Sequence, residues 1–103
     1  MAQQASITQW NLLPGADGAA AVVAGEGASL RRVTVEAGRK ADRHSHPHEQ
    51  FVMIVSGAGR LACEAGEVEL RPGTVLHFPP GAWHSAEFSA ETVLVEVNLP
   101  ERA

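Results

Sequence analysis

Short apolar stretches alternate with turn residues along most of the chain, and this pattern predicts strands. From Ser29 onward, segments rich in valine, leucine and threonine are separated by glycine and proline. No window of about 12 residues keeps a helical period. Glycine permits a positive φ and proline fixes φ at about −65°, so both residues favour turns between the segments. The predicted strands are Ser29–Glu36, Asp42–His46, Glu49–Ser56, Arg60–Ala65, Glu67–Leu70, Val75–Phe78, Trp83–Phe88 and Thr92–Asn98.

The N-terminal part of the chain has a different texture. Ile7–Leu13 is a candidate for one further strand, and Gly15–Ala28 has the alanine and glycine content of a flexible loop. We therefore expect residues 1–28 to be an N-terminal strand and loop packed on a β-barrel of residues 29–103, all within one domain. Many short strands with closely spaced turns favour an all-β fold, an antiparallel sandwich or barrel.

One predicted strand is apolar on both of its faces. In Glu49–Ser56, every residue from Phe51 to Val55 is apolar. Because side chains alternate across a strand, both faces of this strand must be covered. One face would lie toward the barrel interior. The other would lie against a second sheet, a packed N-terminal segment or a partner subunit, and we expect a homodimer.

Composition and charge narrow the class of protein. A chain of 103 residues holds one domain. Its formal charge of −4 disfavours nucleic acid and anionic membranes as partners. The single cysteine, Cys63, excludes an internal disulfide and is compatible with a cytoplasmic protein. The first residues carry no export signal, and the apolar stretch Ala19–Ala24 is far shorter than the roughly 20 residues that span a bilayer.

The histidines are the main candidates for chemistry. The chain has five, and His44, His46 and His48 lie close together. On a strand, His44 and His46 would point to the same face, as suits two ligands of one ion. His84 opens another predicted strand after a rigid turn, where it can face the interior of a barrel. Three neutral imidazoles that converge there would bind a divalent first-row cation. The alternative is a solvated turn that happens to be rich in histidine.

Two spaced patterns in this region resemble the two motifs of the cupin family. The first is Gly38, five residues, His44-Ser45-His46, three residues, Gln50, six residues and Gly57. The second, which follows after 15 residues, is Gly73, five residues, Pro79-Pro80-Gly81, two residues and His84. The resemblance implies a small, single-domain, RmlC-like jelly-roll barrel that holds one metal ion.

The resemblance also implies a set of metal ligands. Gln50 stands where the first cupin motif usually has glutamate, and this resembles a subgroup that binds its metal through three histidines and a glutamine. The implied ligands are His44, His46, Gln50 and His84. Because all four are neutral, a divalent ion would keep its full charge and act as a Lewis acid that attracts anions such as carboxylates and enolates. Zn, Ni, Mn and Fe all remain candidates.

The last predicted strand offers a catalytic carboxylate, but its orientation is open. If the valines of Thr92–Asn98 point inward, Glu96 is solvated. If Leu94, Glu96 and Asn98 point inward instead, Glu96 lies near the ion and suits general acid–base catalysis.

Four further side chains have open roles. Arg60 and Arg102 are candidates to bind a substrate carboxylate through a bidentate fork, or they are solvated charges. His48 could be a fifth ligand, a proton shuttle or a surface group, whereas His77 is expected to face outward.

The chain has no tyrosine, so it cannot form the cysteine–tyrosine crosslink of some cupin thiol dioxygenases.

A narrower resemblance concerns function. The segment His44–Gln50 and the tail Val95–Arg102 resemble the small cupins of pectin degradation. Those cupins convert cyclic 4,5-unsaturated monouronates to open-chain keto acids. In those cupins an aspartate on the last strand moves the proton and an aromatic residue follows, whereas this chain has Glu96 and Asn98. The resemblance implies a Lewis-acid lyase or isomerase acting on a small anionic sugar acid or carbonyl compound. A quercetinase-type dioxygenase and a non-enzymatic binding or sensing module are the alternatives.

Overall fold

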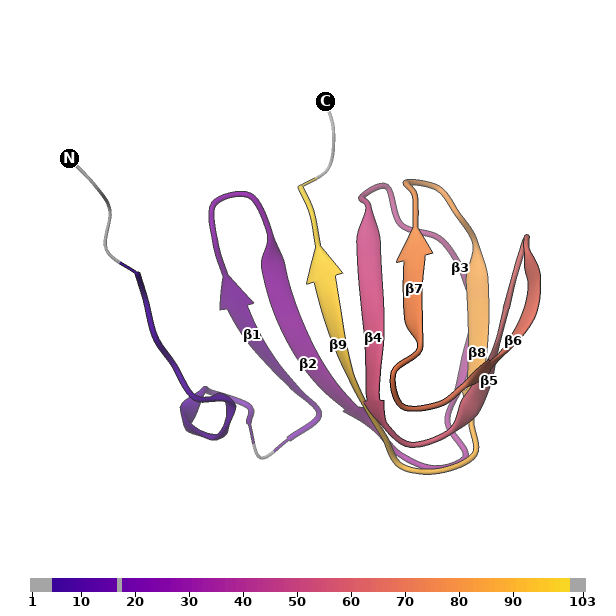
Figure 1. The fold of residues 1–103 in the computed structure, drawn as a ribbon, viewed down its shortest axis with the longest axis horizontal. Coiled ribbons are helices and arrows are strands. Elements are labelled where there is room, and N and C mark those ends of the chain that lie inside the picture. The colour runs from indigo at the N-terminus through magenta and orange to yellow at the C-terminus, as the bar shows by residue number, and fades with distance from the viewer. Residues whose placement is uncertain (1–4, 17, 101–103) are drawn as a thin grey trace.

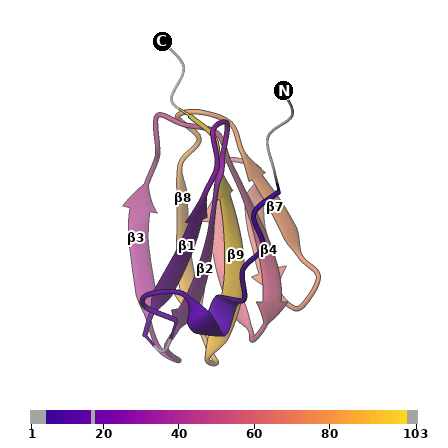
Figure 2. The ribbon, with the colours of Figure 1, turned by 90° about the vertical axis from the view of Figure 1, so that its left-hand side faces the viewer.

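The computed structural model describes residues 5–16 and 18–100, which are almost entirely β-structure (Figure 1). One short 3-10 helix, η1 (Trp10–Leu12), precedes the strands and is the indigo coil in Figure 2. None of the described helical residues forms a segment long and apolar enough to cross a membrane. The strands are β1 (Ala20–Ala24), β2 (Ser29–Val35), β3 (Lys40–His44), β4 (Gln50–Ser56), β5 (Gly59–Cys63), β6 (Gly66–Leu70), β7 (Val75–Phe78), β8 (His84–Phe88) and β9 (Thr92–Asn98).

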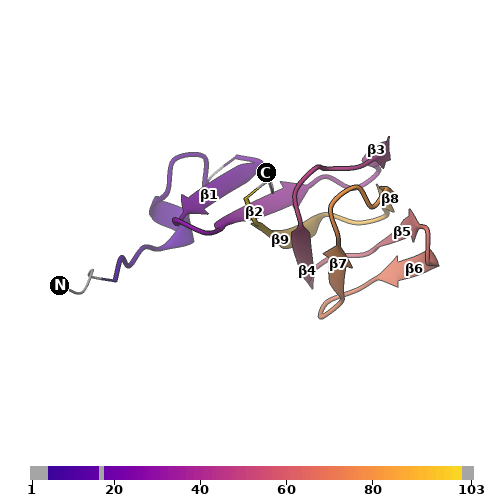
Figure 3. The same cartoon turned by 90° about the horizontal axis from the view of Figure 1, so that it is seen from above.

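The strands form two antiparallel sheets that face each other (Figure 3). The larger sheet has the order β1-β2-β9-β4-β7, and the smaller has the order β3-β8-β5-β6. The predicted all-β jelly-roll fold is confirmed. The two sheets do not close into a hydrogen-bonded barrel, because no ladder joins them within the described chain. Core side chains connect them instead, and β1 extends the larger sheet beyond the smaller one (Figure 1).

The core lies between the two sheets and follows the period of the strands. In β4, Gln50, Val52 and Ile54 point inward, whereas the alternate residues Phe51 and Met53 point outward. Partly buried residues, Cys63 among them, pack around this core. The buried apolar cluster consists of Val52, Ile54, Leu61, Leu70, Phe78, Phe88 and Leu94.

The strands predicted from Ser29 onward are all present, with small shifts at their ends. Val75–Phe78 and Thr92–Asn98 are confirmed to the residue. The largest difference concerns β3, which was expected at Asp42–His46 and lies at Lys40–His44. This strand therefore ends before His46, and that changes how the histidines come together.

The N-terminal predictions fare less well. Trp10–Leu12 forms a 3-10 turn, so the candidate strand Ile7–Leu13 is wrong. The expected loop Gly15–Ala28 contains β1, which pairs with β2 from Ala20↔Val33 to Ala24↔Ser29. Alanine has a weak strand preference, so local composition conceals this strand. Backbone hydrogen bonds to β2 stabilise it, and the expected boundary between residues 28 and 29 falls in the β1–β2 connection.

One glycine of the first motif is required by both its backbone conformation and its surroundings. Gly57 has a φ of 107°, which L side chains rarely adopt. A Cβ atom there would also collide with Cα and Oγ1 of Thr92, a residue that is 0% exposed. The Thr92 hydroxyl accepts a hydrogen bond from the Ala58 amide at 3.2 Å. The turn after β4 is thereby packed against the start of β9.

Candidate metal centre and cavity

Three histidines from two neighbouring strands meet at one place. His44 ends β3 and His84 opens β8, and the two are opposite each other in the β3–β8 ladder. His46 lies two residues beyond β3. One ring nitrogen from each histidine lies within 4.8 Å of the others. The ring centroid of His44 is 4.2 Å from that of His84 and 4.9 Å from that of His46. The structure thus brings together the three histidines singled out in the sequence.

The local backbone explains how His46 reaches the cluster. The β3–β8 register shifts between Ala41 and His44, and the strand ends there. The expectation that His44 and His46 share one face of a strand is therefore wrong. Pro47 follows, and proline cannot donate to a ladder. The carbonyl of His46 instead accepts a hydrogen bond from the amide of Gly81 at 2.8 Å, so the Pro-Pro-Gly turn holds the histidine loop.

Burial favours the neutral form of two of the three imidazoles, His46 and His84. Burial above all, and then the charges of His44 and His46, lower the pKa of His84 to about 4. The pKa of His46 is also lowered, mainly by burial and then by the charges of His44 and His48. Neutral imidazoles retain the lone pair that a metal ion requires.

Hydrogen bonding gives a second sign that these residues fit a metal ion. His44 donates from Nδ1 to the carbonyl of Asp42 at 2.7 Å, because a carbonyl can only accept. This leaves Nε2 of His44 as the nitrogen with a lone pair. The buried Nδ1 of His84 has no hydrogen-bond partner among the described residues. A neutral, partly unsatisfied set of imidazoles suits a divalent first-row ion.

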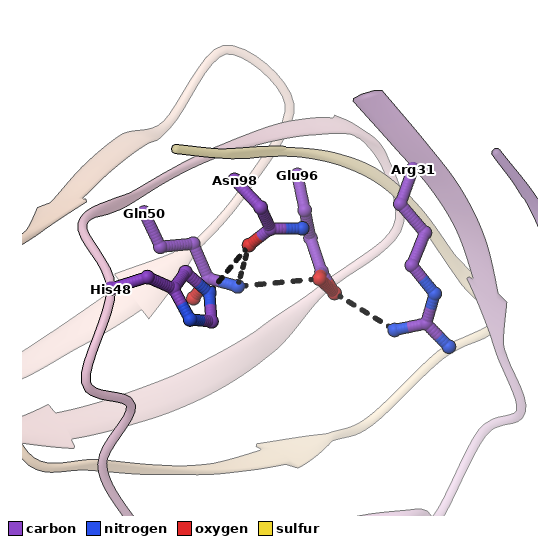
Figure 4. Close-up of polar contacts among 5 residues, drawn as sticks. All are labelled: Arg31, His48, Gln50, Glu96 and Asn98. Carbon is purple, nitrogen blue, oxygen red and sulfur yellow. Dashed lines mark hydrogen bonds and ion pairs between the residues drawn. The ribbon is translucent and has the colours of Figure 1, made fainter. Parts of the chain in front are cut away.

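Gln50 lines the same cavity as this cluster. Two residues of the last strand orient its side chain (Figure 4). Its side chain is 5% exposed. Its Nε2 donates to Oδ1 of Asn98 at 2.9 Å and to Oε2 of Glu96 at 3.3 Å. An ionised carboxylate can only accept, so the amide nitrogen faces Glu96. Oε1 is then the Gln50 atom that remains for a metal ion, which is the arrangement a neutral fourth ligand requires.

The structure settles which face of β9 points inward. Leu94, Glu96 and Asn98 line the cavity between the sheets. The pairing of β9 with β4 sets this orientation, because Gln50 lies opposite Asn98 and Val52 lies opposite Glu96. Glu96 is therefore placed beside Gln50, in the position in which a carboxylate can reach a bound molecule.

Arg31 belongs to the same group of side chains, although sequence reasoning did not select it. Its Nη1 lies 3.4 Å from Oε1 of Glu96, and the two residues are directly opposite in the β2–β9 ladder (Figure 4). The segment Ser29–Val35 contains two adjacent arginines, Arg31 and Arg32, and local sequence does not show which one faces inward. The pairing of β2 with β9 places Arg31 on the cavity side of the sheet, opposite Glu96.

Of the two arginines predicted to bind a substrate, Arg60 lies outside the cavity. Arg60 is exposed and pairs with Glu67 at 3.6 Å across β5 and β6. Its neighbour Leu61 points into the core, so alternation along β5 turns Arg60 away from it. Arg102 lies outside the described residues.

The two remaining histidines occupy different surroundings. His48 lines the cavity, and its Nε2 lies 3.0 Å from Oδ1 of Asn98. His77 faces outward, as predicted, where its Nε2 lies 2.6 Å from Oε2 of Glu49 and its ring stacks on Phe51. Of these two, only His48 is therefore near the histidine cluster, with its ring centroid 5.1 Å from that of His46.

These side chains surround a cavity of about 680 Å³. Cavities of roughly 300–1,000 Å³ are typical of small-molecule sites. A few polar groups in an apolar wall can orient a ligand, and their electrostatic interactions are stronger there than in water. The polar lining includes Arg31, His44, His46, His48, Gln50, His84, Glu96 and Asn98, and the apolar lining includes Val33, Val35, Ile54, Leu76 and Phe78.

The fold and this site define a cupin, and the comparisons with known proteins agree. Residues 31–98 match the family described as Cupin domain. The chain belongs to this family, and the matched segment contains all of β3 to β9 and every residue of the histidine cluster.

Individual relatives show the range of proteins that share this fold. The chain is 36% identical over 73 residues to an (R)-mandelonitrile lyase from Granulicella tundricola, and the match covers 68% of this chain and 54% of the relative. The chain thus spans about half the length of that relative. The structure of KdgF from Halomonas sp. is similar, with a TM-score of 0.73, 23% identity and coverage of 81% of this chain and 80% of KdgF. An RmlC-like cupin from Shewanella frigidimarina gives a TM-score of 0.73, 19% identity and coverage of 81% and 76%.

Proposed function

We propose that this cupin is a metal-dependent lyase or isomerase that acts on a small anionic sugar acid or a related carbonyl compound. One observation carries the proposal. A carboxylate, Glu96, lies in the cavity and is hydrogen-bonded to Gln50, beside three histidines whose ring nitrogens lie within 4.8 Å of one another. The cavity therefore combines a group that can move a proton with a group of side chains that can hold a Lewis acid.

Four residues would hold the metal ion: His44, His46, Gln50 and His84. A divalent ion held there, Zn, Ni, Mn or Fe, would supply positive charge that polarises an oxygen of the substrate. Since none of the four ligands is charged, none of that positive charge is neutralised by the protein.

Glu96 would take a proton from the carbon next to the polarised group, or return one to it. Its two carboxylate oxygens are held separately, Oε2 by Gln50 and Oε1 by Arg31, so the carboxylate cannot rotate freely. Proton transfer by a positioned side chain typically contributes about 10²–10⁴-fold to a rate. The name of one relative, an (R)-mandelonitrile lyase, supports lyase chemistry in a similar chain.

The test begins with the metal. Elemental analysis of the purified protein is expected to find one divalent transition metal per chain, and His46→Ala is expected to lose it. The matched control is His77→Ala, which removes a histidine that faces outward and lies apart from the cluster. Metal loading that is equal in both variants would refute the site.

The second part of the test measures turnover. The metal-loaded protein is assayed with 4,5-unsaturated monouronates and with mandelonitrile, with and without oxygen. We expect oxygen-independent turnover that falls about 10²-fold or more in Glu96→Gln. Full activity of Glu96→Gln would remove its catalytic role. Turnover that requires oxygen would indicate a dioxygenase, and binding without turnover would indicate a binding module.

A further inference from the structure

Arg31 lines the cavity, and the proposed chemistry gives it no contact with the substrate. It is the one lysine or arginine among the described residues that line the cavity, and its side chain is 46% exposed. It is therefore both part of the wall and open to an incoming molecule.

A chain of side-chain contacts connects Arg31 to the surroundings of the histidine cluster. Gln50 lines the same cavity as the histidines, Glu96 contacts Gln50, and Arg31 contacts Glu96 from the far side (Figure 4). A small molecule that spans this line would meet the Lewis acid at one end and the guanidinium at the other. The carboxylate that moves the proton would lie between them.

The charges in the cavity also favour an anion at this end. Two carboxylates line the cavity, Glu26 and Glu96, and Glu96 already contacts Arg31. A divalent ion and Arg31 together carry more positive charge than these two carboxylates carry negative charge. A guanidinium has five N–H donors in a planar fork, and the contact with Glu96 is made by Nη1. Arginine is well suited to bind a second carboxylate through this fork.

We propose that Arg31 binds the carboxylate of the substrate and makes the cavity selective for acids over neutral compounds of the same shape. This inference rests on the proposed function only in placing the reacting end of the substrate at the histidine cluster. It assigns to Arg31 the role that sequence reasoning gave to Arg60 and Arg102. It also distinguishes Arg31 from a residue that serves only to hold Glu96.

The experiment compares an acid with its neutral ester. Isothermal titration calorimetry measures the binding of D-galacturonate and of its methyl ester to the zinc-loaded full chain. The wild type is expected to prefer the acid by about 10-fold or more, as a hydrogen-bonded charge pair implies. Arg31→Gln is expected to lose that preference, and Arg31→Lys to keep part of it. Arg60→Gln is the matched control, because that arginine has a similar ion pair outside the cavity, and it should keep the full preference.

Three results would overturn the proposal. They are the absence of galacturonate binding to the wild type, equal binding of acid and ester, and a preference that survives in Arg31→Gln. Glu96→Gln separates the two roles of Arg31. If Arg31 binds the substrate, removing its partner charge should tighten galacturonate binding, whereas a purely structural Arg31 would give no gain.

The same titration on metal-free protein separates this proposal from the proposed function. A preference that depends on Arg31 and persists without metal would support the carboxylate site even if no turnover is found. Loss of turnover in Glu96→Gln together with an unchanged acid preference in Arg31→Gln would support the reaction and overturn the role of Arg31.

Discussion

Protonation decides, residue by residue, whether the histidine cluster can hold a cation. A protonated imidazole has no lone pair for a metal ion. His46 and His84 both have a lowered pKa, and burial is the main cause in each case. The same burial that keeps these rings neutral also means that the folded state resists taking up a proton there. Metal binding and acid sensitivity therefore have one physical origin.

We predict that the metal-free protein loses stability as the pH falls from about 6.5 towards 4. The pKa of His84 is about 4 in the folded state, below its usual value of 6.5. Between these values the unfolded chain binds a proton that the folded chain does not, so the free energy of unfolding decreases with decreasing pH. The contribution is on the order of 1–3 kcal/mol. Urea unfolding at several pH values measures it.

Two variants separate His84 from the other acid-sensitive groups. His84→Gln is expected to have a flatter pH dependence than the wild type over this range, because glutamine does not titrate. His77→Gln removes an outward-facing histidine and should follow the wild type. An identical pH dependence in His84→Gln and the wild type would contradict the prediction.

Single residues also show where sequence reasoning reaches its limit. The spacing of His44, His46 and His84 was sufficient to predict that they would meet. The orientation of Glu96 was not predictable, since Thr92–Asn98 alternates apolar residues on one face with Leu94, Glu96 and Asn98 on the other. Which face points inward depends on pairing with β4, and Arg31 depends in the same way on pairing with β9. Such register is a long-range property that the local pattern does not contain.

The site also depends on how the secondary-structure elements that carry its residues are held together. His44 and His84 are opposite each other at adjoining ends of β3 and β8. The residues that precede them, Arg43 and Trp83, also contact each other. The guanidinium carbon of Arg43 lies 4.0 Å from the ring centroid of Trp83. This cation–π contact joins the same two strand ends, so it should restrict how far the histidines can separate.

We predict that loss of the Arg43–Trp83 contact weakens both stability and metal binding. Arg43→Ala should lower the free energy of unfolding by about 0.5–1 kcal/mol, as for a partly exposed cation–π pair. Zinc affinity, measured by competition with a chelator, should fall a few-fold because the two ligand-bearing strand ends are held less firmly.

A double-mutant cycle isolates this contact from the other effects of each substitution. The cycle uses Arg43→Ala, Trp83→Leu and the double variant. Lys40→Ala is the control, since it removes an exposed cation from the same strand. A coupling energy indistinguishable from zero between Arg43 and Trp83, or an equal loss of zinc affinity in Lys40→Ala, would contradict the prediction.

Elements were predictable where the sequence alternates strongly and less so where it does not. β7 and β9 are rich in apolar residues and bounded by clear turns, and both were predicted to the residue. β1 was missed because three of its five residues are alanine, which has little strand preference, and because pairing with β2 stabilises it. The end of β3 was displaced by a shift in register, which leaves His46 in a loop.

The molecule as a whole exposes an apolar area on the outside of its larger sheet. We call this area the outer face, and it consists of Phe51, Met53 and Val55 on β4, Val75 on β7 and Val95 on β9. The side chains of Phe51, Met53, Val55 and Val75 are 38–64% exposed. The described part of the N-terminal segment does not cover them, so this apolar area is open to solvent in a single chain.

We predict that a second copy of the chain covers the outer face and that the protein is a homodimer. The five side chains of the outer face are uncharged, and the nearest charged groups, Arg32 opposite Val95 and Glu49 paired with His77, are of opposite sign. A two-fold dimer needs one self-complementary patch, and stable interfaces bury about 800 Å² per partner. Light scattering on a sizing column should therefore give twice the chain mass of 10.9 kDa.

Met53→Glu should give a monomer, whereas Val68→Glu, which alters an exposed apolar residue of the other sheet, should remain a dimer. A monomeric wild type at high micromolar concentration, or a dimer that survives in Met53→Glu, would contradict this assignment, because either result would leave the outer face uncovered in solution.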